Sequence, residues 1–138
     1  MRKIKVLVVE DSYMFRGVLV NGLSSDPGIE VVATANDPFE ARDMIIKHDP
    51  DVMTLDVEMP KMDGHHLLKL IRSTDATKDI PVLIFSSLVN EEMKIKGAAL
   101  GANAQLSKPE IGNLVLEIDK LVQKYSKGYK NTTNNRME

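Results

Sequence analysis

Short apolar runs rich in β-branched residues alternate with segments of helical periodicity along this 138-residue chain. The runs, which predict strands, lie at residues 4–9, 29–33, 51–55, 81–85 and, more weakly, 104–107. Strand followed by helix, repeated five times, predicts an α/β fold with a parallel sheet and helices on both of its faces. The runs are continuously apolar, as in strands that are covered on both faces. In such sheets, ligands bind at the carboxyl ends of the strands.

Two helices have especially clear sequence signals. Residues 37–40, Asp-Pro-Phe-Glu, supply an N-cap side chain, a proline at the first helical position and an acid at the third. Near the far end, apolar residues at helical spacing form one stripe, made of Ile111, Leu114, Val115, Ile118, Leu121, Val122 and Tyr125. Residues 126–138 have no such period and few apolar side chains, which predicts a disordered tail after a folded domain of residues 1–125.

Composition excludes several classes of function. A chain of 138 residues corresponds to one domain, so a second catalytic domain does not fit. The formal charge of −2 argues against a nucleic-acid partner, and no apolar stretch approaches the roughly 18 residues of a membrane span. The chain has no cysteine, which rules out thiolate metal sites and a cysteine nucleophile. The basic start has too short an apolar run for a signal peptide, so we expect a cytoplasmic location.

Polar residues follow four of the predicted strands. The acids Glu10 and Asp11 follow the first strand, and Asp56 ends the third. Ser86 follows the fourth strand and Lys108 the fifth. If the strands lie side by side, three carboxylates, a hydroxyl and an ammonium meet at one edge of the sheet. Carboxylates this close repel one another unless a cation lies among them, and Mg²⁺ prefers such oxygen ligands.

The same arrangement gives Asp56 a chemical role. A carboxylate beside Mg²⁺ is a candidate nucleophile that accepts a phosphoryl group. Phosphoryl transfer requires a metal on one oxygen, a fixed cation on another and a hydrogen-bond donor on the third. Lys108 and Ser86 are the candidates for the cation and the donor.

These residues resemble those of a two-component response-regulator receiver domain. The resemblance rests on VVEDS, PDVMTLDVEMPKMDG, the serine pair at 86–87 and the Lys-Pro pair at 108–109, and it covers roughly residues 3–124. Ser86 and Lys108 follow Asp56 by 30 and 52 residues, the separations found in such receivers. The resemblance implies a flavodoxin-like, CheY-like sheet in strand order 2-1-3-4-5 with five helices.

The resemblance also implies roles for individual residues. Asp11 and Asp56 would ligate Mg²⁺ directly, the backbone carbonyl of Glu58 would add a ligand, and Glu10 would act through water. Lys108 would contact the phosphoryl group and precede a cis peptide bond at Pro109. The phosphoryl donor would be a sensor histidine kinase, and the domain would catalyse only its own phosphorylation and dephosphorylation.

Within the family, two chemotaxis receivers are similar to different parts of the chain. SDPGIEVVATA and the long aspartate motif resemble the receiver of the methylesterase CheB, whereas FSSLVNEEMKIKGAALGANAQLSKPEIG resembles the receiver of the coupling protein CheV. We therefore expect a stand-alone chemotaxis receiver with a CheA-like kinase. A fragment of a CheB- or CheV-type protein and a phosphate sink remain alternatives.

Three departures from the family pattern affect the expected switch. Glu10 replaces the commoner aspartate, and Glu58 places an acid beside the phosphoryl site. Gln105 occupies a position where such receivers often carry an aromatic switch residue. We expect Gln105 to stay at the surface and contact a partner, with Ser86 and its loop carrying the switch. Leu116, apolar but off the buried stripe, is expected in the same partner face.

Another class of protein uses similar residues. Haloacid dehalogenase-type phosphatases also pair an aspartate nucleophile with Mg²⁺ and carry an acid two residues later, as Asp56 and Glu58 do. Their motif closes the first strand, whereas here it closes the third, so this alternative is less favoured. The neighbouring histidines 65 and 66 are expected to be a solvated helix start rather than ligands or phosphocarriers, because adjacent helical residues face different directions.

Overall fold

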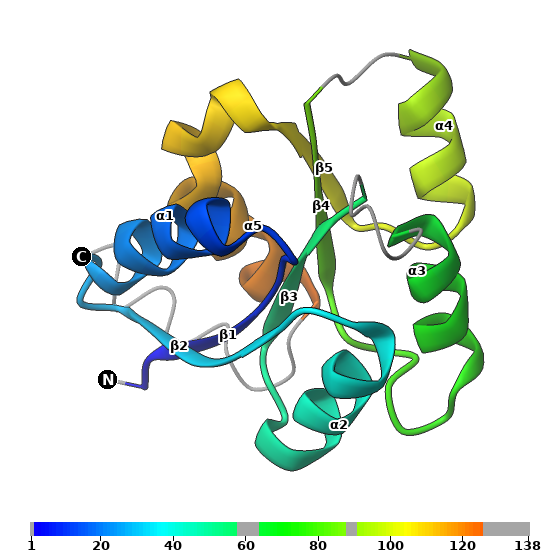
Figure 1. Cartoon of the computed structure of the whole chain (residues 1–138), viewed down its shortest axis with the longest axis horizontal. Helices are drawn as coiled ribbons and strands as arrows, with labels where there is room; N and C mark the ends of the chain where they lie inside the picture. Colours follow the sequence, from blue (N-terminus) through cyan, green and yellow to red (C-terminus); the bar gives the residue numbers. More distant parts are fainter. Residues whose placement is uncertain (1, 58–63, 88–90, 126–138) are drawn as a thin grey trace.

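The computed structural model describes residues 2–57, 64–87 and 91–125. Its five strands form a single parallel sheet in the order β2-β1-β3-β4-β5. The strands are β1 (Ile4–Val9), β2 (Ile29–Ala35), β3 (Val52–Asp56), β4 (Val82–Ser86) and β5 (Ala104–Ser107). The helices are α1 (Tyr13–Ser24), α2 (Pro38–His48), α3 (Gly64–Ser73), α4 (Glu91–Ala99) and α5 (Leu114–Tyr125), with a 3-10 helix η1 (Lys108–Asn113) before α5 (Figure 1).

The fold predicted from the sequence is confirmed, with small shifts at the ends of strands. β2 continues to Ala35, two residues beyond the predicted end, and β3 and β4 each begin and end one residue later than predicted. The N-cap at Asp37 is also confirmed, because its side chain accepts a hydrogen bond of 2.8 Å from the Glu40 amide. The predicted tail, residues 126–138, lies outside the described residues.

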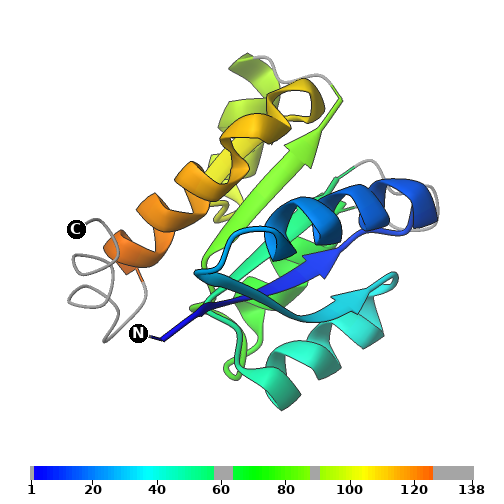
Figure 2. The ribbon, with the colours of Figure 1, turned by 90° about the vertical axis from the view of Figure 1, so that its left-hand side faces the viewer.

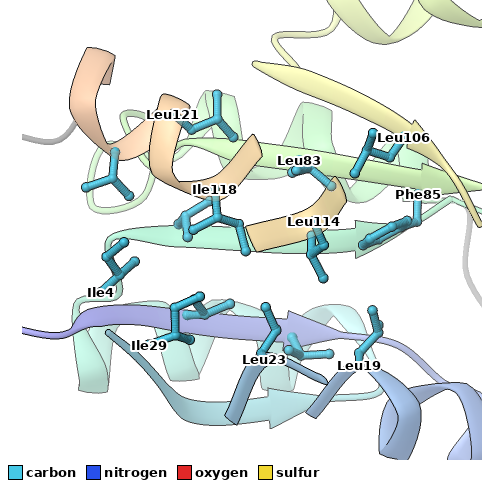
Figure 3. Close-up of a cluster of buried hydrophobic side chains, with 14 residues drawn as sticks. Ile4, Leu19, Leu23, Ile29, Leu83, Phe85, Leu106, Leu114, Ile118 and Leu121 are labelled. Carbon is cyan, nitrogen blue, oxygen red and sulfur yellow. The ribbon is translucent and has the colours of Figure 1, made fainter. Parts of the chain in front are cut away.

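Helices lie on both faces of the sheet (Figure 2). Two layers of buried apolar side chains, one on each face, hold them there. One layer joins α1 and α5 to the sheet, and ten of its side chains are labelled in Figure 3: Ile4, Leu19, Leu23, Ile29, Leu83, Phe85, Leu106, Leu114, Ile118 and Leu121. The other layer holds α2 and α3 through Ala41, Ile45, Leu67, Leu68 and Ile71. Burying a Leu- or Ile-sized side chain contributes about 1.5–3 kcal/mol, so these layers fix the strand ends in place. The predicted stripe on α5 is confirmed at its four buried residues, whereas Tyr125 is 44% exposed.

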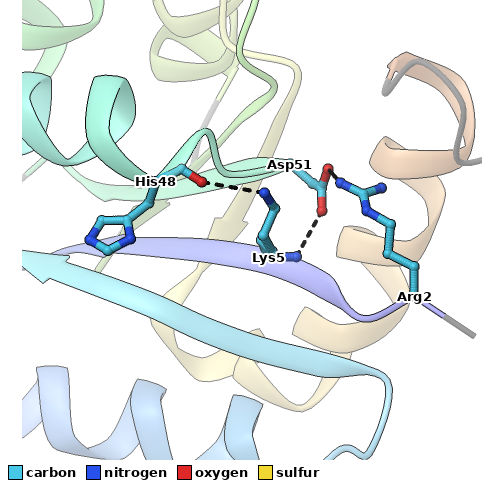
Figure 4. A network of polar contacts seen from close by, with 4 residues as sticks. All are labelled: Arg2, Lys5, His48 and Asp51. Carbon is cyan, nitrogen blue, oxygen red and sulfur yellow. Dashed lines mark hydrogen bonds and ion pairs between the residues drawn. The ribbon is translucent and has the colours of Figure 1, made fainter.

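A polar network closes the edge of the sheet where the strands begin (Figure 4). The carboxylate of Asp51 accepts hydrogen bonds from the Arg2 guanidinium and from the Lys5 amide, the latter at 2.8 Å. The Lys5 ammonium donates to the His48 carbonyl at 3.3 Å. Buried Asp51 is thereby paired, and this edge has a structural explanation separate from the opposite edge, where the predicted site lies.

The peptide bond before Pro109 differs from the expectation. No cis peptide bond occurs in the described part of the chain, so the Lys108–Pro109 bond is trans and the predicted cis bond is wrong. Pro109 lies in the first turn of η1, where its fixed φ suits a helix and its missing N–H leaves no unpaired donor. The trans form is also the lower-energy isomer before proline by about 0.5–1 kcal/mol.

Candidate functional site

The turn from β1 into α1 presents the first two acids. The Glu10 amide donates to the Ala35 carbonyl at 2.9 Å, which keeps this residue in line with the sheet. Ser12 then caps α1, its hydroxyl accepting from the Phe15 amide at 3.3 Å. Glu10 Oε2 accepts from the Ser12 amide at 2.9 Å, so one carboxylate oxygen is used to hold the turn. Asp11 lies between these two residues and is only half-buried.

Asp56 is the last residue of β3 and is 3% exposed. Its register partner on β4 is Phe85, whose carbonyl accepts a 3.1 Å hydrogen bond from the Val57 amide. Gly64, the first residue of α3, lies against this backbone, and a Cβ there would be 2.8 Å from the Asp56 carbonyl oxygen. The end of β3 is therefore fixed on two sides.

Lys108, the first residue of η1, reaches Asp56 from just beyond the end of β5. Its ammonium lies 3.1 Å from Asp56 Oδ2, and its side chain is 26% exposed. The backbone at Lys108 is held by the capping box of η1, in which the Ser107 amide and hydroxyl both donate to Glu110, at 3.1 and 2.7 Å. These hydrogen bonds lower the pKa of the Glu110 carboxyl. The ammonium also lies over the ring of Phe15, 4.8 Å from its centroid.

The three carboxylates converge as expected. Glu10, Asp11 and Asp56 each offer an oxygen within 4.8 Å of the others'. Burial raises the pKa of Glu10 to about 8, and the hydrogen bond that the protonated Glu10 carboxyl donates to Asp56 adds to the shift. Nearby Asp56 raises it further, while the Ser12 amide and the Lys108 charge oppose the shift. Three carboxyl groups therefore meet at this site, and the Lys108 ammonium supplies a single positive charge to balance them.

The donor set fits a hard divalent cation. Glu10 is fully buried, and its Oε1 has no hydrogen-bond donor within the part of the chain that the structure describes. A buried carboxylate oxygen without a donor requires a proton or a cation. All three residues offer only oxygen, the ligand type that Mg²⁺ prefers, and these oxygens lie within 4.8 Å of one another. These residues therefore fit Mg²⁺.

The remaining predicted residues are less tightly grouped. Ser86 ends β4 one residue after the register partner of Asp56, and it is 2% exposed. Gln105 lies on β5 and is half-buried, with its amide donating to the Lys94 carbonyl of α4 at 2.8 Å. Leu116 is 55% exposed on α5. Glu58 lies outside the described residues.

Gln105 is therefore not a freely exposed side chain. Part of its side chain remains at the surface, and its amide lies over Gly97 of α4. A Cβ at Gly97 would be 2.8 Å from Gln105 Nε2, so this buried glycine makes room for the amide. Whether Gln105 contacts a partner stays a prediction.

Sequence reasoning missed three features that shape the site. Phe15 gave no signal, because an aromatic residue one turn into a helix is usually core. Gly64 ended the quoted aspartate motif, yet only the fold shows the backbone it approaches. The box between Ser107 and Glu110 was visible in the sequence as the S-x-x-E spacing of a helix start.

Comparisons with known proteins agree with this geometry. The family model described as the response regulator receiver domain matches residues 6–119, so the chain belongs to the response-regulator receiver family. This membership decides against the phosphatase alternative. Receiver domains of this kind accept phosphoryl groups from histidine kinases and bind Mg²⁺ through acidic residues.

The relatives include chemotaxis receivers. The chain is 48% identical over 115 residues to the protein-glutamate methylesterase/protein-glutamine glutaminase of Bordetella pertussis, covering 81% of this chain and 32% of that protein. It is 34% identical to the response regulator domain of Thermotoga maritima CheB, with a TM-score of 0.78 over 88% of this chain and 98% of that one. It is also 34% identical to Vibrio cholerae CheY4, with a TM-score of 0.76 over 86% and 98%.

The matches to the methylesterases cover only one part of those proteins. The chain spans about a third of the length of the curated methylesterases that it matches, and the match lies in their receiver part. The chain is thus a response-regulator receiver closely related to CheB receivers. Among the described helices, none is long and apolar enough to cross a bilayer.

Proposed function

We propose that Asp56 accepts a phosphoryl group from a CheA-like histidine kinase in a cytoplasmic chemotaxis pathway. The observation that carries the proposal is the 3.1 Å contact between Lys108 and Asp56 beside two further acids. An Asp56 oxygen attacks phosphorus, the bond from phosphorus to the donor's imidazole nitrogen breaks, and an aspartyl phosphate forms. The leaving nitrogen keeps the bond's electron pair and takes a proton.

Each neighbouring side chain has a part in this transfer. Asp11 and Asp56 would hold Mg²⁺, with Glu10 acting through water, and the bound ion would neutralise charge on the phosphoryl oxygens. Lys108 exchanges its ion pair with Asp56 for a contact with a phosphoryl oxygen. Ser86 donates to another oxygen from the end of β4. Because Asp56 is buried, its side chain has few alternative conformations. Its carboxylate is therefore already oriented in the folded protein, and little entropy is lost in orienting it for the reaction.

The output is proposed to be a change in partner binding. Ser86 and its loop follow the phosphoryl group, and the face made by α4, β5 and α5 changes with them. Gln105 and Leu116 belong to this partner face. We assign this role to the unit of residues 1–125 and propose no catalysis beyond its own phosphorylation and dephosphorylation.

Intact-mass spectrometry tests the assignment. Wild type incubated with acetyl phosphate and Mg²⁺ is expected to gain one phosphoryl group, and Asp56→Asn none. Excess chelator should also prevent labelling, because the acid cluster would repel the incoming dianion. Equal labelling of Asp56→Asn, or of wild type in chelator, would contradict the proposal. A parallel incubation with a CheA-like kinase tests the donor.

A further inference from the structure

Four side chains form a closed set of contacts at the site. Asp56 contacts Lys108 at 3.1 Å, and the Lys108 ammonium lies 4.8 Å from the centre of the Phe15 ring. Phe15 meets Phe85 edge to face, with ring centroids 6.1 Å apart and planes at 88°. Phe85 is in turn the register partner of Asp56. The set thus joins β3, β4, η1 and α1 around the Asp56 carboxylate.

The Phe15 ring is held firmly enough to act as a guide. Its backbone amide is the group capped by Ser12, so its place on α1 is fixed by the same turn that presents Glu10 and Asp11. Its ring packs against the core layer of α1 and α5, and Phe85, which it contacts, is fully buried. A movement of the Phe15 or Phe85 ring would therefore disturb the packing of the apolar layer between α1, α5 and the sheet.

Lys108 needs such a guide. A lysine side chain has four rotatable methylene bonds and carries about 2 kcal/mol of rotamer entropy, and here it is partly open to solvent. Its ion pair with Asp56 is the contact that must be exchanged when a phosphoryl group arrives. A second attraction that survives the exchange would keep the ammonium at the site, and the negative face of an aromatic ring supplies one.

We infer that Phe15 is a positioning residue for phosphoryl transfer, holding the Lys108 ammonium through a cation–π contact while Asp56 is modified. The inference rests on the proposed function of Asp56 and Lys108. Phe15 touches neither phosphate nor metal and acts through Lys108. Its contribution is a higher rate of transfer, with no change expected in Mg²⁺ affinity.

Stepwise fluorination separates this role from packing. Mono-, di- and trifluorophenylalanine at position 15 weaken the charge on the ring face while nearly keeping its shape. The rate of phosphorylation by acetyl phosphate with Mg²⁺, followed by intact mass, is expected to fall with each fluorine, by roughly 3- to 10-fold over the series. Phe15→Tyr should retain the rate, and Phe15→Leu should lower it. A rate that stays flat across the series, with an unchanged melting temperature, would overturn the inference.

Phe39 provides a matched control in the same chain. It is 68% exposed on α2, with the Arg42 guanidinium 5.8 Å from its ring centroid, far along the chain from Lys108. The same fluorinated series at Phe39 should leave the rate unchanged. An equal fall there would mean that fluorination acts nonspecifically and would also count against the role of Phe15.

A second measurement does not depend on phosphorylation. The aromatic ring should shift the NMR signals of the Lys108 side-chain methylene and ammonium protons upfield, and Phe15→Leu should abolish the shift. If wild type gains no phosphate, the proposed function fails, while the upfield shift decides whether the Phe15 contact exists. Absence of that shift in wild type would overturn the inference whatever the labelling result.

Discussion

Gly64 lies so close to Val57 that a Cβ on the glycine would be 2.5 Å from the Val57 Cα. The same Cβ would be 2.8 Å from the Asp56 carbonyl oxygen, and both neighbours are backbone atoms that a rotamer change cannot move aside. The first residue of α3 therefore sets the position of the backbone that carries the Asp56 carboxylate. This packing explains the glycine that ends the aspartate motif.

Gly64→Ala is expected to destabilise the protein by roughly 1–3 kcal/mol, because overpacking forces the backbone to shift. It should also slow phosphorylation of Asp56. Urea unfolding and intact-mass labelling measure the two effects. Gly22→Ala is the control, since nothing lies within 4 Å of a Cβ there and alanine should stabilise α1. Equal stability changes at the two glycines would show that the Gly64 contact is relaxed in solution.

Much of the fold and most of the site followed from the sequence, for physical reasons. Continuous apolar runs fix the strands, and parallel strands must bring their carboxyl ends together, which places Glu10, Asp56 and Lys108 at one edge. What escaped prediction depends on distances between segments remote in sequence. The ring of Phe15 and the amide of Gln105 find their partners only after helices pack. The family resemblance led us to expect a cis bond before Pro109, whereas the structure has a trans bond there, with Pro109 in the first turn of η1.

The pH dependence of stability should report the state of Glu10. Burial and Asp56 raise its pKa to about 8, above its ordinary value of 4.5. Between these values the folded chain holds a proton that the unfolded chain releases, so the unfolding free energy falls as pH rises. Glu10→Gln in chelator should be more stable than wild type by on the order of 1–3 kcal/mol at pH 8 and by little at pH 5.

Urea unfolding across this pH range measures the difference. Glu30→Gln, at an exposed acid on β2, is the control. Saturating Mg²⁺ should reverse the order at pH 8 by stabilising the folded wild type. Parallel pH curves for wild type and Glu10→Gln would show that Glu10 is already ionised in the folded chain.

Mg²⁺ affinity should distinguish the first two acids. Glu10 uses Oε2 to hold the Ser12 amide, and we expect this carboxylate to act on the ion through water. Glu10→Ala should then weaken binding by roughly 10-fold, as losses of outer ligands do, and Asp11→Ala by more. Isothermal calorimetry with wild type and both variants measures this. The reverse order would show that Glu10 is the direct ligand.

Arg72 is expected to be a major source of stability. Its guanidinium donates to the carbonyls of Lys78, Ile80 and Gly101 and to the Asn103 side chain, at 2.6 to 3.1 Å. Burial lowers the pKa of this arginine. The four acceptors nevertheless provide hydrogen-bond partners for the N–H groups of its planar guanidinium. Arg72→Lys keeps the charge but loses the fork and should cost about 2–4 kcal/mol.

Chemical denaturation compares this variant with Arg42→Lys. Arg42 lies on the surface beside Asp43 at 3.8 Å, and its replacement should change stability by less than about 0.5 kcal/mol. If the two variants lose the same free energy of unfolding, the hydrogen bonds of the Arg72 guanidinium contribute nothing to stability beyond the positive charge that lysine keeps.

Gln105 and Gly97 test how phosphorylation is transmitted. The Gln105 amide donates to the Lys94 carbonyl and occupies the space where a Gly97 Cβ would lie. Gly97→Ala should therefore push the amide outward, breaking this hydrogen bond without removing the side chain. Because alanine also favours helix by about 1 kcal/mol, the net change in stability should be small. Gln105→Ala instead removes the amide altogether.

The measurement is the affinity for a partner recovered from the host with beryllofluoride-loaded protein, taken with and without beryllofluoride. A ligand shifts a conformational equilibrium only by its differential affinity, so the ratio of the two affinities reports the switch. We expect Gln105→Ala and Leu116→Ala to lower both affinities and keep the ratio, and Gly97→Ala to keep the ratio with both affinities near wild type. If Gly97→Ala and Gln105→Ala both bring the ratio to one while the affinity without beryllofluoride holds, the hydrogen bond to Lys94 is the switch and Gln105 is not a partner contact.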